Sequence, residues 1–518
     1  MRRSESPEAR SATLESKKNQ QATVNTRQQR RTQPQATVDT VCRNGRHGLQ
    51  ERWTRCSGTV DTACTIGGMD DVLSLFRDVV ASVPAYPKFL AEHGVGPESV
   101  RSFEDFQQLP LTSKKNYQSR YPLAELCRDG RIGDMISVSS GSSGTPTIWP
   151  RSVSDELHIT QRFEQVFRAF EADTKTTLAV ICFPLGTWVG GLFTLACVRH
   201  LSNQGFPITS VAPGNNKAEI LRVLPELAPH FDQVVLLGYP PFVKDVVDSG
   251  SGWASYDIKM VFAGEVFSEE WRDLVASRAG VRDPVSGMVS LYGTADAGVL
   301  GNETSKSVSI RRFLATRPDL ARELFGDSRL PSLLQYDPRS RFFEVHNGTL
   351  LFSGDNGVPL IRYHIADEGG VITHEQMLEF CDDNGFTPTD GPDLPFVFVF
   401  GRSLFTVSYF GANIYPENVT VGLEQPEISD WVTGKFVLET YEDDDRDRRL
   451  RITVELAPGQ QGDAARIADE ILAQLRRLNS EFANYVPAER QLPEVVLRPA
   501  GDPEYFPVGV KHRYTRPS

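Results

Sequence analysis

The chain has 518 residues, 40% of them apolar and 24% charged, which fits a globular protein of two or three domains. Its formal net charge of −12 argues against a nucleic-acid binder, because such a protein needs a basic face. The seven cysteines lack paired spacing, so we expect a reducing, cytoplasmic setting and no disulfide framework.

Residues 1–68 differ from the remainder of the chain. They carry twice as many Lys and Arg as Asp and Glu, and they are rich in Gln, Thr and Ser with few large apolar residues. This composition predicts disorder. One interpretation is a transit-like peptide. We favour another, that residues 1–68 are a mis-annotated extension and that Met69 is the native start, because a helical apolar pattern begins at Asp70.

From Met69 to Phe400, short apolar runs alternate with helical stretches. Strands are predicted at residues 135–138, 178–183, 234–237 and 260–263. Ser268, followed by two glutamates, predicts a helix start with Ser268 as the N-cap. Buried strands that alternate with helices indicate an α/β fold. We expect residues 69–400 to form a large layered N-terminal domain of β-sheets flanked by helices.

Residues 176–198 carry no charged side chain and are long enough to cross a membrane. Pro184, Gly186, Gly190 and Gly191 interrupt the run. We therefore predict a buried strand, a loop and a helix start, and no membrane partner.

Residues 401–518 are predicted to form a small, mobile α+β domain. Strands are expected at residues 435–440, 450–456 and 495–497, and helical spacing covers residues 462–484. An acidic run at residues 442–445 lies between the first two strands. We interpret this run as a solvated hairpin tip rather than a metal site.

The most informative motif follows the strand at residues 135–138. Glycines let backbone N–H groups approach an anion, and hydroxyls add donors, so the loop suits a polyphosphate. Ser/Gly runs alone also occur as flexible linkers. The strand before this run and the ordered chain after it favour a phosphate loop. The run is Ser139, Ser140, Gly141, Ser142, Ser143, Gly144, Thr145, Pro146 and Thr147.

Four later segments follow this loop in a fixed order, at residues 263–265, 291–298, 359–367 and 401–416. Together they resemble the adenylate-forming superfamily of acyl-CoA synthetases. Residues 109–115 with Tyr121 and Pro122, and the adenine-loop segment 264–270, resemble the phenylacetate–CoA ligase-like branch of that superfamily. The resemblance covers Met69 to the C-terminus.

The resemblance implies a two-step reaction. A carboxylate attacks the α-phosphate of ATP and gives acyl-AMP and pyrophosphate; a nucleophile, commonly the CoA thiol, then takes the acyl group. The resemblance assigns residues 69–400 as the AMP-binding domain. It further implies that ATP, Mg²⁺ and CoA take part, with a small carboxylic acid as substrate. The oligomeric state is left open, with a homodimer as one option.

Roles follow from the matching motifs. The resemblance implies that Asp296 binds Mg²⁺, in a position usually held by Glu, and that Lys511 meets the α-phosphate during adenylation. Asp367 would bind the ribose, and Arg402 the ribose or a phosphate. The remaining expected nucleotide contacts are Ser139, Ser140, Gly141, Ser142, Ser143, Gly144, Thr145, Gly264, Glu265, Tyr292, Gly293 and Thr294.

The acid pocket is expected beside the loop after Phe183. Phe183, Trp188 and Tyr239 are the candidate lining residues and favour an aromatic acid, although each could equally be plain core. The scattered cysteines of the folded part predict no zinc site.

The pattern departs from the family after Arg402. Leu404 and Phe405 stand where acidic hinge residues are usual, and Phe410 stands where a basic residue is usual. Since rotation of the small domain builds the CoA tunnel in this family, the acceptor is open. CoA is the first choice. The alternatives are an amine, a carrier-protein thiol, activation of an oxyanion such as nitrite, or a regulator that binds nucleotide without catalysis.

Overall fold

The structure, a computed structural model, describes residues 69–139, 147–327, 329–402, 406–426, 428–507 and 514–516. The expectations for residues 1–68, most of the Ser/Gly loop, the hinge residues Leu404 and Phe405, and Lys511 therefore lie outside the described residues.

The largest sheet in the described part of the chain has 11 strands. The strand pairs β3–β4, β3–β5, β5–β6 and β6–β7 are parallel. The pairs β7–β8, β8–β9, β9–β13, β13–β12, β12–β11 and β11–β10 are antiparallel. In spatial order the strands are β10 (Phe342–His346), β11 (Thr349–Gly354), β12 (Leu360–Ile372), β13 (Phe396–Arg402), β9 (Ser332–Gln335), β8 (Gly298–Asn302), β7 (Met288–Thr294), β6 (Ile258–Ala263), β5 (Gln233–Gly238), β3 (Thr177–Ile181) and β4 (Ile208–Val211).

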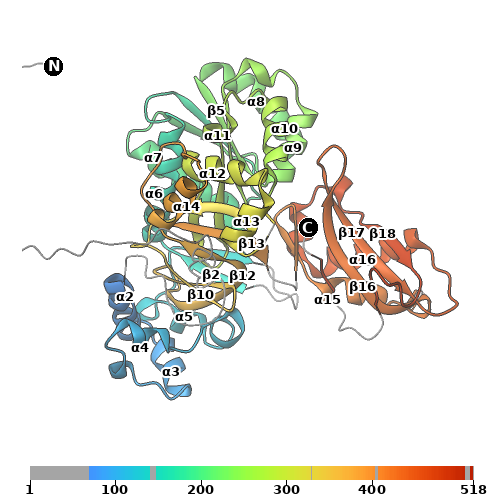
Figure 1. The fold of residues 1–518 in the computed structure, drawn as a ribbon, viewed down its shortest axis with the longest axis horizontal. Helices are drawn as coiled ribbons and strands as arrows, with labels where there is room; N and C mark the ends of the chain where they lie inside the picture. Colours follow the sequence, from blue (N-terminus) through green and yellow to red (C-terminus); the bar gives the residue numbers. More distant parts are fainter. Residues whose placement is uncertain are drawn as a thin grey trace, which may run out of the picture. The chain divides into compact units, whose positions relative to one another are not determined.

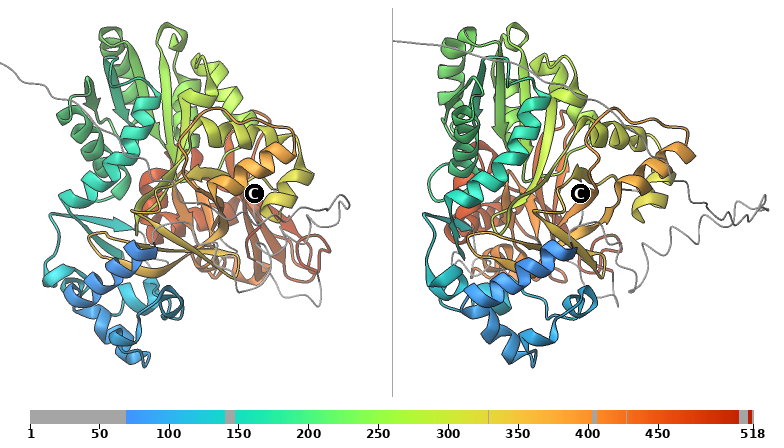
Figure 2. Two further views of the ribbon diagram at one scale, coloured as in Figure 1. Left: turned by 60° about the vertical axis from the view of Figure 1, so that its left-hand side comes forward. Right: turned by 90° about the vertical axis from the view of Figure 1, so that its left-hand side faces the viewer.

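Helices cover both faces of the parallel part of this sheet, as the views of Figure 2 show. Leu178, Val180 and Leu236 pack in the cluster that holds helices α8 (Lys217–Leu227), α9 (Pro240–Ser249) and α10 (Glu269–Ala279). The alternate residues Ala179 and Ile181 face α6 (Val153–Ala169) and α7 (Val189–Asn203). Because both faces are buried, these strands are continuously apolar rather than alternating.

The antiparallel part is covered in two places. Buried side chains of one core join its strands to α12 (Ser305–Ala315), α13 (Pro318–Phe325) and α14 (His374–Asp383), while α11 (Pro284–Gly287) precedes β7. A second core packs the strands β10, β11 and β12 against the N-terminal helices, which are drawn in blue in Figure 1. These are α2 (Met69–Ser82), α3 (Ala85–Glu92), α4 (Phe103–Gln107) and α5 (Leu123–Leu126); the hairpin of β1 (Met135–Ser139) and β2 (Thr147–Arg151) follows them.

Residues 401–518, here called the C-terminal region, hold two smaller sheets. A three-stranded sheet carries α16 against it (Figure 1), and a short hairpin of β14 and β15 precedes that sheet in the chain. The elements are β14 (Val407–Tyr409), β15 (Ala412–Ile414), α15 (Pro416–Leu423), β16 (Val432–Glu442), β17 (Arg448–Leu456), α16 (Ala464–Leu478), α17 (Ser480–Tyr485) and β18 (Glu494–Arg498).

The predicted α/β fold is confirmed, and the predicted strands of both regions are present. Ser268 is the N-cap of α10, and its side chain accepts a hydrogen bond from the Trp271 N–H. The uncharged run at residues 176–198 forms β3, a loop and most of α7. Among the described residues, no helix combines the length and apolarity that a membrane crossing requires.

Two expectations for the C-terminal region need correction. The helix predicted over residues 462–484 is two helices, because Asn479 adopts an extended backbone and its side chain caps α17 by accepting from the Phe482 N–H. The acidic run does lie at the tip between β16 and β17, but it is not simply solvated. Asp445 pairs with Arg278 of α10, a partner that local composition could not indicate.

Candidate functional site

A cavity of about 810 Å³ contains most of the predicted nucleotide residues that the structure describes. Its lining comes from both the sheet region and the C-terminal region. Ser139, Gly264, Glu265, Tyr292, Gly293, Thr294, Asp296 and Asp367 all contribute to it. Residues from four separate motifs therefore meet at one place, as expected for a single binding site.

The base of the Ser/Gly loop is anchored by hydrogen bonds. Ser139 ends β1 and pairs in register with Thr147 of β2, so the loop spans the end of a hairpin. The buried Ser139 Oγ accepts from Trp149 Nε1 at 3.0 Å and from Lys114 Nζ at 3.3 Å. A lysine thus stands at the foot of the predicted phosphate loop. The segment from Ser140 to Thr145 lies outside the described residues.

Lys114 was missed by the sequence analysis. It begins a π-helical turn (Lys114–Gln118) that Ser113 caps, and π turns are frequent at functional sites. The preceding Thr112 exchanges backbone hydrogen bonds with Arg362 and His364 of β12, which fixes this turn beside the sheet. Residues 109–115 were noted only for their family resemblance, and no role in the site was expected for Lys114.

Asp296 lies in the turn between β7 and β8. Its Oδ2 accepts from the Tyr363 hydroxyl at 2.5 Å, and its Oδ1 lies 3.6 Å from Lys114 Nζ. The turn itself is held by Thr294, whose Oγ1 accepts from the Ala297 N–H at 3.1 Å. Asp296 is therefore a buried carboxylate held next to a cation at the edge of the cavity.

Asp367 and Tyr292 form a second polar pair in the cavity. The Tyr292 hydroxyl donates to Asp367 Oδ2 at 2.7 Å, and the backbone of Asp367 pairs with that of Arg402 across β12 and β13. Ala366 has a φ of +65°, a left-handed conformation that favours glycine. The local geometry thus carries a cost in backbone strain.

We call these five side chains the floor of the site: Lys114, Ser139, Tyr292, Asp296 and Asp367. Each comes from the region of residues 69–400. The floor has a cation and a buried carboxylate at one end and a tyrosine–carboxylate pair at the other. Such an arrangement can bind a phosphate through Lys114 and sugar hydroxyls through Asp367.

Glu265 occupies a different position from the floor residues. Its Oε1 accepts from the Gly411 N–H at 2.7 Å, and its Oε2 lies 3.6 Å from Arg448 Nε. Burial raises the pKa of Glu265, and the charge of Arg448 and the hydrogen bond from Gly411 oppose that rise. The carboxylate predicted to read adenine is therefore engaged by the C-terminal region.

Gly411 can approach this closely only because it lacks a side chain. Its φ is +80°, and a Cβ at this position would lie 2.4 Å from Cζ of Tyr239. Gly264 also has a left-handed φ of +90° and abuts the same Tyr239 ring. The β14–β15 turn and the predicted adenine loop thus meet on one aromatic side chain.

The predicted acid pocket is only partly as expected. Phe183 and Tyr239 line the cavity, with ring centroids 5.1 Å apart, but Trp188 does not line it. The Trp188 ring instead packs against Tyr485, with ring centroids 4.9 Å apart. The ring centroids of Tyr485 and Tyr239 are 5.6 Å apart. Tyr485 is the last residue of α17 and was missed, because it lies just beyond the helical stretch predicted over residues 462–484.

We call the C-terminal elements at the cavity the roof of the site: the β14–β15 hairpin with Glu481 and Tyr485 of α17. Glu481 Oε2 accepts from the Asn413 backbone N–H at 3.1 Å and so ties the hairpin to α17. All of these elements line the cavity together with the floor.

Comparison with known proteins adds to this geometry. No family model matches the chain. Two phenylacetate-coenzyme A ligases are similar in sequence. The one from Thermus thermophilus is 23% identical over 358 residues, covering 68% of this chain and 73% of its own length. The one from Aromatoleum evansii is 21% identical over 401 residues, covering 74% and 79%.

A crystal structure of 2-hydroxyisobutyryl-CoA ligase, in complex with its acyl-AMP and CoA, has a similar fold. Its TM-score is 0.59 at 15% identity, and the match covers 86% of this chain and 88% of that one. The sequence relatives, the fold and the ordered motifs agree. The chain is thus similar in sequence to phenylacetate-coenzyme A ligases and similar in fold to 2-hydroxyisobutyryl-CoA ligase.

Proposed function

We propose that the protein is an AMP-forming ligase that activates a carboxylic acid with ATP and transfers the acyl group to the thiol of CoA. A carboxylate oxygen attacks the α-phosphorus, and the bond to pyrophosphate breaks. The thiol sulfur then attacks the acyl carbon, its proton is lost to solvent, and AMP leaves. The relatives' names as phenylacetate-coenzyme A ligases support this assignment.

One observation carries the proposal: the two ends of the floor fit the two ends of a nucleotide. Asp367 and Tyr292 offer hydrogen-bonding groups for a ribose, and Lys114 stands beside Ser139 at the foot of the Ser/Gly loop. Charge that develops on a phosphate in the transition state needs donors and cations rather than a protein nucleophile. The floor supplies both.

The residues present also fit a magnesium ion. Asp296 offers hard carboxylate oxygens at the cavity edge, the ligand type that Mg²⁺ prefers. A bound Mg²⁺ would neutralise charge on the phosphates. The Tyr363 hydroxyl holds Asp296 in orientation, and Lys114 adds a second positive charge beside it.

We propose an aromatic acid as the substrate. Phe183 and Tyr239 give the cavity an apolar end, and Tyr485 packs on Tyr239 from the roof. Flat aromatic walls bind a flat apolar acid through buried surface and ring contacts. Lys511, from the C-terminal region, is proposed to meet the α-phosphate during adenylation, so Lys511→Ala should nearly abolish ATP–pyrophosphate exchange.

The test is a pyrophosphate-release screen over aromatic and aliphatic acids, with and without CoA. Release that depends on an aromatic acid, followed by thioester formation with CoA, supports the proposal. Release that depends on an acid but yields no thioester overturns CoA as the acceptor. An absence of acid-dependent release across the panel overturns the adenylation.

A second candidate keeps adenylation and replaces CoA by an amine or a carrier-protein thiol. The observation that favours it is Phe410, which is 2% exposed and stacks edge-on against Tyr409 where the family usually has a basic residue. Trapping with hydroxylamine separates the two candidates. Hydroxamate without a CoA thioester favours the second candidate, and efficient thioester formation excludes it.

A further inference from the structure

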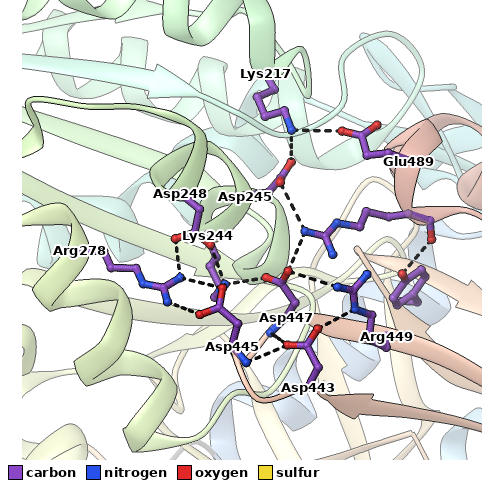
Figure 3. A network of polar contacts seen from close by, with 12 residues as sticks. Lys217, Lys244, Asp245, Asp248, Arg278, Asp443, Asp445, Asp447, Arg449 and Glu489 are labelled. Carbon is purple, nitrogen blue, oxygen red and sulfur yellow. Dashed lines mark hydrogen bonds and ion pairs between the residues drawn. The ribbon is translucent and has the colours of Figure 1, made fainter.

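Most buried cations in the described part of the chain are paired with carboxylates. Lys244 of α9, at the centre of the ion-pair network in Figure 3, has a side chain that is 1% exposed. Its Nζ lies 2.6 Å from Asp248 Oδ2 and 2.6 Å from Asp447 Oδ1. The buried guanidinium of Arg272 is likewise held by two glutamates. Such pairing is expected, because a charge that leaves water needs a partner to replace its hydration.

Arg151 and Arg341 are exceptions. They are 1% and 5% exposed, yet neither forms an ion pair with a described carboxylate. Burial lowers the pKa of Arg151, and the more distant charges of Asp155 and Asp296 oppose that change. The Asp155 carboxylate accepts hydrogen bonds from Ser152 at the start of α6, whereas Asp296 lines the cavity. The donors of Arg151 are therefore available for groups other than a carboxylate.

The Arg151 side chain binds the peptide group that leads into Asp296. Its Nη2 donates to the backbone oxygen of Ala295 at 2.5 Å, and its Nη1 donates to the backbone oxygen of Pro150 at 3.2 Å. The Ala295 carbonyl and the Asp296 N–H belong to one planar peptide unit. Hydrogen bonds from a charged donor are stronger than neutral ones. The guanidinium therefore fixes the backbone from which the Asp296 carboxylate projects.

Arg151 also belongs to the hairpin that carries the Ser/Gly loop. It is the last residue of β2 and lies on the same face of that strand as Trp149, whose Nε1 donates to Ser139 Oγ at the foot of the loop. Lys114 closes a ring of contacts, since its Nζ lies 3.3 Å from Ser139 Oγ and 3.6 Å from Asp296 Oδ1. The strand β2 thus contacts both the foot of the loop and the turn that holds Asp296.

Two glycines enclose the backbone at Arg151. A Cβ on Gly133 would lie 2.4 Å from the Arg151 carbonyl oxygen, and a Cβ on Gly357 would lie 2.3 Å from the Pro150 carbonyl oxygen. The segments before β1 and before β12 therefore pack against the end of β2 without room for a side chain. The guanidinium starts from a fixed backbone, as a group that orients another residue requires.

We propose that Arg151 is a positioning residue for adenylation: it holds the turn that carries Asp296 to the hairpin of the Ser/Gly loop, so that both meet one Mg²⁺–ATP complex. This inference rests on the proposed function, in which Asp296 is the Mg²⁺ ligand. Arg151 does not touch the nucleotide in this account. It acts through the Ala295–Asp296 peptide.

Titration of the protein with Mg²⁺–ATP, without an acid substrate, tests this role. Arg151→Met should raise the dissociation constant about tenfold, an effect typical of the loss of a group that orients a metal ligand. The dissociation constant describes molecules that remain folded, so a partial loss of folded protein does not imitate the effect. Arg151→Lys, which keeps a charged donor, should recover part of the affinity. An unchanged dissociation constant in Arg151→Met overturns the proposal.

A double-mutant cycle shows whether Arg151 acts through Asp296. If it does, Arg151→Met should weaken Mg²⁺–ATP binding by less than about twofold in a protein that already carries Asp296→Asn. Full additivity of the two losses overturns the proposal, since it means that Arg151 acts independently of Asp296.

Arg341 provides a matched control. It is also buried without an ion pair, but its Nη1 and Nη2 donate to the Ser340 backbone oxygen and to Asn356 Oδ1 rather than to the Asp296 turn. Arg341→Met should leave the affinity for Mg²⁺–ATP unchanged. An equal loss in Arg151→Met and Arg341→Met overturns the proposal, because the loss would then follow from the removal of any buried charge in this part of the fold.

A second readout needs no nucleotide. Hydrogen–deuterium exchange of residues 294–298 should be several-fold faster in Arg151→Met than in wild type and in Arg341→Met, because the Ala295 carbonyl loses its partner. Unchanged protection of this turn overturns the proposal even when affinity falls. If wild type does not bind Mg²⁺–ATP, the proposed function fails, and protection of residues 294–298 then judges the positioning of the turn by itself.

Discussion

The floor and the roof of the cavity are built in different ways. Floor contacts join side chains to one another and to the main sheet, as in the Tyr363–Asp296 and Tyr292–Asp367 bonds. Roof contacts depend on a glycine approach, aromatic edges and a distant ion-pair network. The difference teaches that the part proposed to bind the nucleotide is held by contacts within one region, while the other part can be weakened separately. Variants of the two parts should therefore affect different half-reactions.

The largest effect is expected in the floor. Asp296→Asn and Lys114→Met each remove charge at the proposed phosphate and Mg²⁺ site, so adenylation and overall product formation should both fall at least about 100-fold. The measurement is ATP–pyrophosphate exchange together with product formation. Asp173→Asn, which alters an exposed acid paired with Arg168, is the control and should have no effect. Near-normal exchange in Asp296→Asn would remove this residue from the site.

The second-largest effect is expected in the roof. Gly411→Ala adds a methyl group that meets the Tyr239 ring and also strains a left-handed backbone, so transfer should fall about 30-fold while exchange is retained. Gly434→Ala is matched in φ, at +81°, but has open space around it. It therefore reports strain alone. Equal losses in the two variants would mean that contact with Tyr239 does not matter.

A smaller effect is expected for the aromatic wall. Tyr485→Leu removes the ring that packs on Tyr239 and Trp188, so KM for the best aromatic acid should rise about tenfold with little change in KM for ATP. Tyr485→Phe keeps the ring and should stay close to wild type. Steady-state kinetics with both substrates make the comparison. An equal rise in both KM values would argue against a wall of the acid pocket.

The smallest expected effect is on the pH dependence of folding stability, to which Asp447 and Glu265 contribute with opposite signs. Asp447 has a lowered pKa, so its stabilisation is complete above the usual carboxylate value of about 4 and is lost as the pH falls through the folded-state value. Glu265 has a raised pKa, so its charged form is a cost at neutral pH that is relieved on acidification.

Thermal unfolding of variants at these two residues measures the opposite contributions to stability. At pH 7, Asp447→Asn should lower the unfolding temperature by a few degrees and Glu265→Gln should raise it. The difference for Glu265→Gln should shrink as the pH falls towards about 4, whereas the difference for Asp447→Asn should shrink only below about 4. A stabilising Asp447→Asn at pH 7 would contradict the assigned pairing with Lys244.

Much of the fold was predictable because its signals are local. The apolar run of β5 is buried along its whole length, and Ser268 caps α10 as its flanking glutamates indicate. The ordered motifs also identified the floor residues Tyr292, Asp296 and Asp367. These signals lie within a few residues of the feature that they predict.

What could not be predicted depends on partners that are distant in the chain. Lys114 enters the cavity because Thr112 pairs with β12, and nothing near Lys114 indicates that pairing. Asp445 was expected at a solvated tip because its partner Arg278 belongs to a helix 167 residues earlier in the chain. Tyr485 lies beyond the predicted helical stretch, and its ring partner Tyr239 is distant in the chain, so nothing local indicates that it lines a pocket.

The most direct test of the account is acid-dependent ATP–pyrophosphate exchange, measured with wild type and Asp296→Asn over a panel of aromatic and aliphatic acids. The account predicts exchange by wild type with at least one aromatic acid and a loss of about 100-fold or more in the variant. No exchange with any acid, or equal exchange by both proteins, would contradict it.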